Sequence, residues 1–364
     1  LLETPFKEKI HTIPDMKKPM NLYKACSDLA TRQSVGVKPL LDLVNKVGGW
    51  PMIQKSWSPS NYSWQNAYYY LRSRLGSNYI IEVTVDVNSK DTTTKAIHID
   101  SPNFGMGAKE LGNPNADRDT RRLVAAYKTY IKDAASLLNF QAISSEAINK
   151  DIEDMFRFES SLAKATTSSE ERNAQYEEIT IRQLNEQFKG VKWKQLLKKI
   201  FTYANTEVKD TDLVIMQDSK YYKSLPSIMR STPKRVIANY IAWRIVLYYG
   251  DFTTKEFTDV YFKYQKVSEG LRSKEKLWEF CYETVDDYFD YALGRLYVDN
   301  YFNSKAKSDI NRMIRYVKSA VGNQLSRQKW MDMKTKRTAI EKVLSTISFS
   351  FSFSIENLTF SSFS

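Results

Sequence analysis

The chain has 364 residues, 42% of them hydrophobic and 13% aromatic, with only 12 glycines and 10 prolines. This composition is typical of a globular protein, excludes a disordered chain, and favours long helices over a many-turned β fold. A chain of this length can form about two domains. The formal net charge of +12 makes nucleic acid or another anionic surface a candidate partner.

No run of eighteen apolar residues occurs, so the sequence predicts no membrane-spanning helix. Residues 1–7 have neither the basic nor the apolar region of a signal peptide, and the sequence does not begin with methionine. We therefore expect the natural N-terminus to lie upstream of this sequence.

Helical periodicity begins near the start of the chain. The first helix is expected over residues 16–30, with Leu22 and Cys26 on one face. A β-hairpin follows, because residues 81–87 alternate apolar and polar and, after a polar loop, residues 96–99 are apolar again. Only this one β element is predicted.

Four helices are expected in the middle of the chain. Apolar residues recur at helical spacing over 118–138 and over 146–165. Thr180 and Gln183 match a capping box, which satisfies backbone donors at the start of a short helix. The lysines of residues 189–199 surround apolar side chains, which indicates the solvated face of an amphipathic helix rather than a phosphate track.

The most apolar helix is expected to begin with Thr232 as its cap and Pro233 at its first position, and to end at Gly250. It is apolar nearly all round, so we expect it to lie buried at the centre of the fold. Residues 274–296 form another long helix, whose inward stripe holds Leu277, Cys281, Thr284, Tyr288 and Ala292.

The last helices are expected at residues 308–321 and 333–344, the second capped by Asp332. Residues 345–364 differ from the rest: serine and phenylalanine dominate, lysine and arginine are absent, and apolar residues alternate strictly from Ile347 to Ile355. Such an isolated strand cannot bury its own face and is prone to aggregation. We expect this tail to lie outside the fold and to replace a natural continuation of the chain.

The sequence shows no catalytic, cofactor-binding or metal-binding constellation. Its two histidines, His11 and His98, are not part of His-Glu-x-x-His and have no second histidine within reach, so a zinc site is not expected. The carboxylate pairs Glu170-Glu171 and Asp286-Asp287 are adjacent and point to different faces of a helix, so we place them on the solvated surface.

Two features of the sequence are relevant to whether the protein is secreted. The only cysteines, Cys26 and Cys281, are enough for one disulfide, but two buried thiols fit the composition equally well. Asn61-Tyr62-Ser63 is a glycosylation sequon, consistent with secretion.

Several short patterns, in order and spacing from about Lys17 to Val343, resemble the N-terminal region of the neprilysin and endothelin-converting-enzyme family of zinc metallopeptidases. They lie at residues 22–26, 39–41, 48–51, 97–102, 105–106, 158–159, 162–166, 170–172, 239–240, 243–244, 294–298, 330–332 and 335–336.

The resemblance implies a mainly α fold: a multi-helix lid domain over residues 1–344, with one small β-hairpin. In this family the domain caps a thermolysin-like catalytic domain and encloses a cavity that admits peptides but not folded proteins. The catalytic His-Glu-x-x-His belongs to the C-terminal half, so we expect this chain to hold no zinc and to be inactive alone, with zinc in the intact enzyme. Asn66-Ala67-Tyr68 matches a family substrate motif but lies far upstream of its usual place, and we interpret it as coincidence.

The resemblance also implies that Cys26 and Cys281 form a disulfide, which would join the first helix to the helix at 274–296. The expected location is extracellular, with the intact protein either membrane-anchored or secreted. The expected partners are the missing C-terminal catalytic domain and peptide substrates, and not nucleic acid.

Two other functions stay open from the sequence. The chain could be secreted as a non-catalytic module that binds peptides as a decoy, although an apolar surface would then be exposed. A basic helical nucleic-acid binder is the third hypothesis, and it predicts binding that weakens steeply with salt.

Overall fold

A computed structural model describes residues 17–172, 177–302 and 304–345. The chain divides into two compact units, one formed by residues 28–274 and the other by the residues up to Ser27 together with those from Glu275 onwards. The tail predicted to lie outside the fold falls on residues 346–364, beyond the described residues, apart from Ser345.

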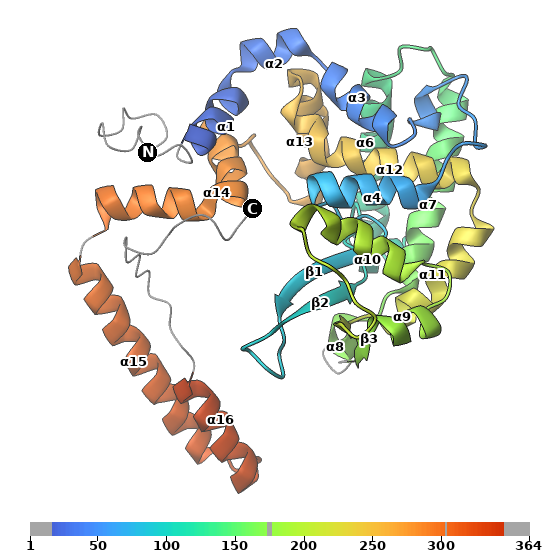
Figure 1. Cartoon of the computed structure of the whole chain (residues 1–364). Coiled ribbons are helices and arrows are strands. Elements are labelled where there is room, and N and C mark those ends of the chain that lie inside the picture. Colours follow the sequence, from blue (N-terminus) through green and yellow to red (C-terminus); the bar gives the residue numbers. More distant parts are fainter. Residues whose placement is uncertain (1–16, 173–176, 303, 346–364) are drawn as a thin grey trace. The chain divides into compact units, whose positions relative to one another are not determined.

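The larger unit is mainly helical (Figure 1). Its helices are α2 (Leu29–Val35), α3 (Lys38–Lys46), α4 (Trp64–Leu75), α5 (Ala108–Gly112), α6 (Arg118–Leu137), α7 (Ser145–Ala165), α8 (Ser169–Arg172), α9 (Ile181–Gln187), α10 (Trp193–Phe201), α11 (Ser219–Ser231), α12 (Lys234–Tyr249) and α13 (Lys255–Ser268). Helices α6, α7, α9 and α10 confirm the helical periodicity read from the sequence, and the capping box of Thr180 and Gln183 is present.

Helix α12 lies at the centre of this unit, as its sequence predicts. Every residue from Val236 to Val246 is buried, and the helix contacts α3, α4 and α7. One detail of the prediction is wrong: Pro233 is the N-cap of α12, and Thr232 is the C-cap of α11 instead. The Thr232 hydroxyl donates backwards to the carbonyl of Ile228 at 2.7 Å, and the N-cap of α12 has no side-chain hydrogen bond.

The predicted hairpin is confirmed as β1 (Glu82–Val87) and β2 (Lys95–Asp100), which pair antiparallel. Two further strands extend it into a four-stranded sheet in the order β1-β2-β4-β3. Strand β4 (Leu213–Met216) runs parallel to β2, and β3 (Glu177–Thr180) runs antiparallel to β4. Each added strand has only four residues, too few for a periodic signal in the sequence.

The smaller unit contains α1 (Lys17–Ser27), α14 (Leu277–Tyr301), α15 (Ser304–Arg327) and α16 (Met333–Ser345). Helix α1 packs on α14 through a small core of Tyr23, Cys26, Cys281, Val285, Leu293 and Leu296. Helix α16 follows Asp332, whose carboxylate accepts from the backbone N–H of Thr335 at 2.9 Å, as predicted for a cap.

Two expected helices differ in detail. The expected helix at 16–30 is divided at Asp28, which instead caps α2 by accepting from the backbone N–H of Thr31 at 3.0 Å. Helix α14 is kinked at Phe289, whose backbone is non-helical (φ −139°, ψ 33°). Tyr288, the residue before the kink, is 55% exposed and not inward-facing, whereas Cys281 is buried as expected.

Candidate functional site

A buried ionic centre joins the helices of the larger unit. Glu159 on α7 is fully buried, and its two carboxylate oxygens accept from the backbone N–H of Gly105 at 2.7 Å and from the hydroxyl of Tyr127 at 2.9 Å. The Arg244 guanidinium on α12 lies 3.9 Å from the same carboxylate. The indole N–H of Trp243 donates to the Tyr127 hydroxyl at 2.7 Å, so α6, α7 and α12 meet at one polar cluster.

Arg244 ties a loop and two aromatic rings to this centre. Its Nη1 donates to the carbonyl of Asn103 at 2.7 Å and to the hydroxyl of Tyr240 at 3.2 Å. The guanidinium also lies 5.0 Å from the centre of the Tyr79 ring, a cation–π distance. Glycine is required at 105, because a Cβ there would lie 1.9 Å from the Tyr127 hydroxyl oxygen.

Burial raises the pKa of the Glu159 carboxyl, and Arg244, the Gly105 N–H and the Tyr127 hydroxyl partly offset that rise. Burial alone would lower the pKa of Arg244, but Tyr240 and Glu159 raise it above its ordinary value. Arg244 and the fixed hydrogen bonds thus offset part of the cost of burying the Glu159 carboxyl, and the same contacts join three helices.

Beside Arg244 lies a cavity of about 350 Å³. Its walls are largely aromatic, with one cation and one carboxylate: Tyr79, Gly105, Arg244, Leu247, Tyr248, Tyr261, Tyr264, Ser268 and Glu269. Since Arg244 already serves the ionic centre, this wall of the cavity is rigid.

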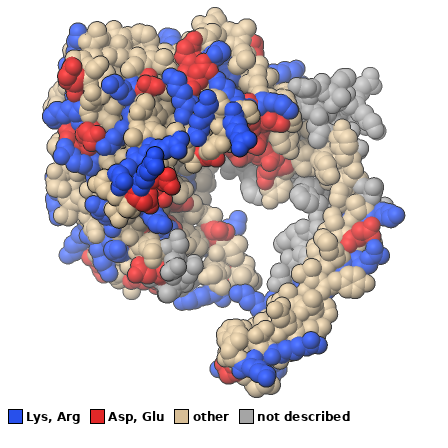
Figure 2. Space-filling model, turned by 180° about the vertical axis from the view of Figure 1, so that it is seen from behind, with Lys and Arg blue, Asp and Glu red and all other residues tan. Residues whose placement is uncertain are grey.

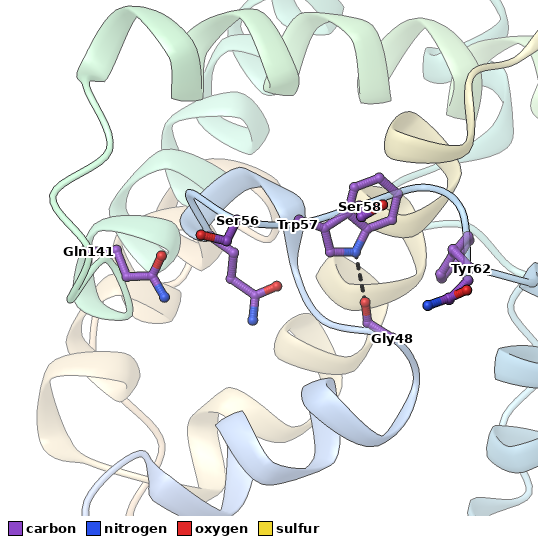
Figure 3. A pocket seen from close by; sticks show the side chains of 8 residues that line it. Gly48, Ser56, Trp57, Ser58, Tyr62 and Gln141 are labelled. Atoms are coloured by element: carbon purple, nitrogen blue, oxygen red, sulfur yellow. Dashed lines mark hydrogen bonds between the residues drawn. The ribbon is translucent and has the colours of Figure 1, made fainter.

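A second cavity, of about 380 Å³, lies on the same unit (Figure 3). It is lined by aromatic, amide and hydroxyl side chains: Gly48, Gln54, Ser56, Trp57, Ser58, Asn61, Tyr62 and Gln141. The indole N–H of Trp57 donates to the carbonyl of Gly48 at 2.7 Å, the contact drawn in Figure 3. Gly48 has φ +106°, and a Cβ there would come within 2.7 Å of the Tyr62 ring, so this turn requires glycine.

The sites predicted from sequence lie as follows. Cys26 and Cys281 are joined in the structure by an S–S bond of 2.06 Å, with Cα atoms 5.6 Å apart, inside the core of the smaller unit. Asn61 lies exposed in a turn, two residues before α4 is capped by Ser63. His98 is half-buried on β2, and its Nε2 atom makes no hydrogen bond; His11 lies outside the described residues.

Comparison with known proteins decides the family. A family model described as peptidase family M13 matches residues 1–349. The chain belongs to peptidase family M13. It is 33% identical to neprilysin-1 of Trittame loki over 331 residues, which cover 90% of this chain and 46% of that protein. It is 25% identical to endothelin-converting enzyme 1 of Rattus norvegicus over 330 residues, covering 90% of this chain and 42% of the relative.

Solved structures show the same fold. Zinc metalloprotease ZMP1 of Mycobacterium tuberculosis, crystallised with an inhibitor, matches with a TM-score of 0.72 at 21% identity, over 89% of this chain and 47% of that one. PepO of Lactobacillus rhamnosis matches with a TM-score of 0.70 at 16% identity, over 90% and 49%. The chain thus has the mainly helical fold expected for this family and spans about half the length of the curated relatives it matches.

The family patterns converge on the ionic centre. Glu159, Arg244 and Gly105 come from three separate patterns noted in the sequence, and the structure brings them together. Tyr127 lies in the helix predicted at 118–138, where periodicity indicates only an apolar position, although its hydroxyl has two partners in this centre.

Other candidate residues have ordinary structural roles. Asp286 and Asp287 are both exposed, as predicted. In the Asn66-Ala67-Tyr68 segment of α4, Ala67 and Tyr68 are buried and the Tyr68 hydroxyl donates to the carbonyl of Ile81 at 2.8 Å. Within residues 17–172, 177–302 and 304–345, no group of three His, Cys, Asp or Glu side chains is placed to hold a metal, and no helix could cross a membrane.

Of the lysines of residues 189–199, Lys194, Lys198 and Lys199 lie on an amphipathic helix, as predicted, whereas Lys192 is its N-cap and Lys189 precedes it. Helix α10 buries Trp193, Leu196 and Leu197. Lys194 forms an ion pair with Asp210 at 2.6 Å. On the face that Figure 2 shows, lysine and arginine side chains are interspersed with acidic ones over the larger unit.

Removing both charges of the ionic centre should destabilise the chain by less than the sum of the two single removals. Glu159→Gln or Arg244→Met alone should lower the free energy of unfolding by about 3–5 kcal/mol, because the remaining charge stays buried without its partner. The double variant should lose less than the sum of the two by at least ~1 kcal/mol. Chemical denaturation followed by near-ultraviolet circular dichroism measures all three.

Lys38→Met is the matched control, because Lys38 pairs with Asp42 at 2.7 Å on an exposed helix face. That loss should be about 0.5 kcal/mol or less. Additive losses at Glu159 and Arg244 would show that the two charges act independently, contrary to the coupling inferred here.

Proposed function

We propose that this chain is the N-terminal, non-catalytic part of a zinc endopeptidase and forms one wall of the chamber in which the intact enzyme encloses its peptide substrates. The observation that carries the proposal is the match of the M13 family model to residues 1–349 of a sequence without His-Glu-x-x-His. The relatives named neprilysin-1 and endothelin-converting enzyme 1, and the zinc metalloprotease among the solved structures, support it.

The residues of this chain do not fit a zinc site. The sequence holds only His11 and His98, and its two cysteines are bonded to each other. A catalytic zinc needs three protein ligands and an open position for water. The zinc of the intact enzyme, which would activate that water, is therefore assigned to the C-terminal part.

The role of this chain is steric. A wall that excludes bulky substrates must be rigid. The ionic centre of Glu159 and Arg244 supplies this rigidity, because it fixes three helices of the larger unit together. Substrate choice then arises from access to the reacting centre as well as from contacts near the scissile bond.

The smaller unit supports a C-terminal partner. Among its described residues, large apolar side chains on and between α14, α15 and α16 are more than half exposed: Trp278 51%, Tyr288 55%, Tyr291 70%, Tyr297 51%, Tyr301 63%, Met313 58%, Tyr316 69%, Val317 57%, Trp330 76%, Met333 79% and Leu344 63%. Exposure of many large apolar side chains is typical of an interface. We assign its cover to the catalytic half of the same protein.

We further propose an extracellular location, either as a membrane-anchored ectodomain or as a secreted protein. The two cysteines support it, because a structural disulfide is formed and kept in oxidising compartments.

The first test concerns zinc and activity. The purified chain should bind no stoichiometric zinc by metal analysis and should not cleave peptides. The full-length transcript should continue in frame into a His-Glu-x-x-His sequence. Zinc-dependent peptide cleavage by the chain alone, with contaminating full-length enzyme excluded, would refute the non-catalytic role; a reproducible stop after Ser364 would favour the decoy.

The second test concerns the exposed surface of α15. A Met313→Cys variant should react with a maleimide at least about tenfold faster in the chain alone than in the intact enzyme, a difference of about 1.4 kcal/mol. The reason is that the catalytic half would cover this side chain. Labelling of both proteins in denaturant should be equally fast, as a control. Equal labelling of the two folded proteins would show that α15 does not face the catalytic half.

The third test concerns the disulfide. A non-reducing peptide map should contain a cross-linked pair of peptides with Cys26 and Cys281, which disappears after reduction. The bond closes a loop with a sequence separation of 255, so Cys26→Ser should lower the free energy of unfolding by up to roughly 5 kcal/mol in the loop-entropy model. Two free thiols in secreted material would refute the bond.

A further inference from the structure

Asn61 belongs to two features that the fold brings together. It is the acceptor position of the sequon Asn61-Tyr62-Ser63, and it lines the cavity of Figure 3 with Trp57 and Tyr62. A group attached to its side chain would start at the wall of a cavity of about 380 Å³, within the range of small-ligand sites, about 300–1,000 Å³.

The lining suits a sugar ring. The Trp57 ring is half-buried and lies with its centre 5.7 Å from that of Tyr62, at an angle of 60°. Apolar C–H faces of a pyranose pack on aromatic rings, which offer large rigid surfaces at low entropic cost. In Figure 3 the Trp57 indole N–H points to the Gly48 carbonyl, to which it donates.

Polar groups in the same lining have hydrogen-bonding capacity left. The Tyr62 hydroxyl is buried, in a side chain only 7% exposed, and has no hydrogen-bond partner. Such an orphaned hydroxyl costs about 1–3 kcal/mol unless a ligand or water satisfies it. The Gln141 side chain uses its oxygen to accept from the Lys55 N–H at 2.7 Å, which leaves its amide NH₂ as a donor.

We propose that Asn61 carries an N-linked glycan whose first N-acetylglucosamine packs in this cavity against Trp57 and Tyr62. The proposal rests on the extracellular location given under the proposed function. The Asn61 Nδ2 forms a bond to the anomeric carbon of a diphosphate-activated oligosaccharide, the bond from that carbon to the diphosphate oxygen breaks, and one Nδ2 proton is released. Neither oxidant nor reductant is needed.

The local structure is compatible with this modification. Asn61 is exposed in its turn, so the side chain is accessible. The Ser63 hydroxyl accepts from the backbone N–H of Asn66 at 3.3 Å and caps α4 once the chain has folded. Attachment to the unfolded chain leaves that hydroxyl free for the transferase, and folding then closes the turn around the first sugar.

The test uses the chain secreted from eukaryotic cells. Mass spectrometry should find Asn61 occupied, and Asn61→Gln should remove the glycan. The matched control Ser63→Thr keeps both the sequon and the capping hydroxyl, so it should stay glycosylated. An amidase that cleaves between asparagine and the first sugar should act at least about tenfold more slowly on folded than on denatured protein, which corresponds to about 1.4 kcal/mol.

Two variants test whether the slower cleavage of the folded protein depends on packing of the sugar in the cavity. Trp57→Ala should bring the rate for folded protein close to that for denatured protein. Tyr62→Phe removes only the hydroxyl and keeps the sequon, so it should give a smaller increase; it also serves if Trp57→Ala fails to fold. An unoccupied Asn61 in secreted protein, or equal cleavage rates for all folded variants, would overturn the proposal.

These outcomes are distinguishable from failure of the proposed function. If the secreted protein contains the Cys26–Cys281 bond but no glycan, only the glycan site is refuted. If both thiols are free and the chain is retained inside the cell, the extracellular location fails as well. If Asn61 is unmodified and the protein binds free N-acetylglucosamine in this cavity, the cavity is a site for a diffusible sugar. This result would also overturn the proposal.

Discussion

The larger unit depends on one constraint: a carboxylate and a guanidinium that are both removed from water must find each other and enough hydrogen bonds. Glu159 meets this condition with Gly105 and Tyr127, and Arg244 meets it with Asn103 and Tyr240. Apolar packing alone tolerates sliding of one helix on another, whereas these fixed donors and acceptors are satisfied in one register only. The position of α7 relative to α12 therefore follows from chemistry as well as from volume.

Local sequence patterns predicted the helices and caps that depend only on nearby residues of the sequence. Helix α12 is apolar nearly all round and is buried from Val236 to Val246, and the cap at Asp332 needed only neighbouring residues. Predictions failed where a contact with a distant or competing partner determines the conformation of a residue. The Thr232 hydroxyl donates to the Ile228 carbonyl of the preceding helix, and Tyr288 is exposed beside the kink at Phe289.

The same distinction holds for the sites. Glu159 and Arg244 could be noted in the sequence through family patterns, but their contact joins residues 85 positions apart, and no periodicity reports it. The polar role of Tyr127 could not be predicted, because a tyrosine at an apolar position of a helix fits the same sequence pattern as any other apolar residue. Asn61 was visible as a sequon, whereas the cavity beside it depends on Gly48 allowing the Tyr62 ring to approach.

The two units differ in how completely each buries its own apolar surface. This difference supports the proposal that the two units have different roles. The larger unit encloses three tryptophans, Trp50, Trp193 and Trp243, each with 0% exposure. In the smaller unit Trp278 and Trp330 are 51% and 76% exposed. A unit that carries its own core can act as a rigid wall, while one that leaves such rings in water gains most by packing against another domain. Rigidity and docking are thus assigned to different parts of one chain.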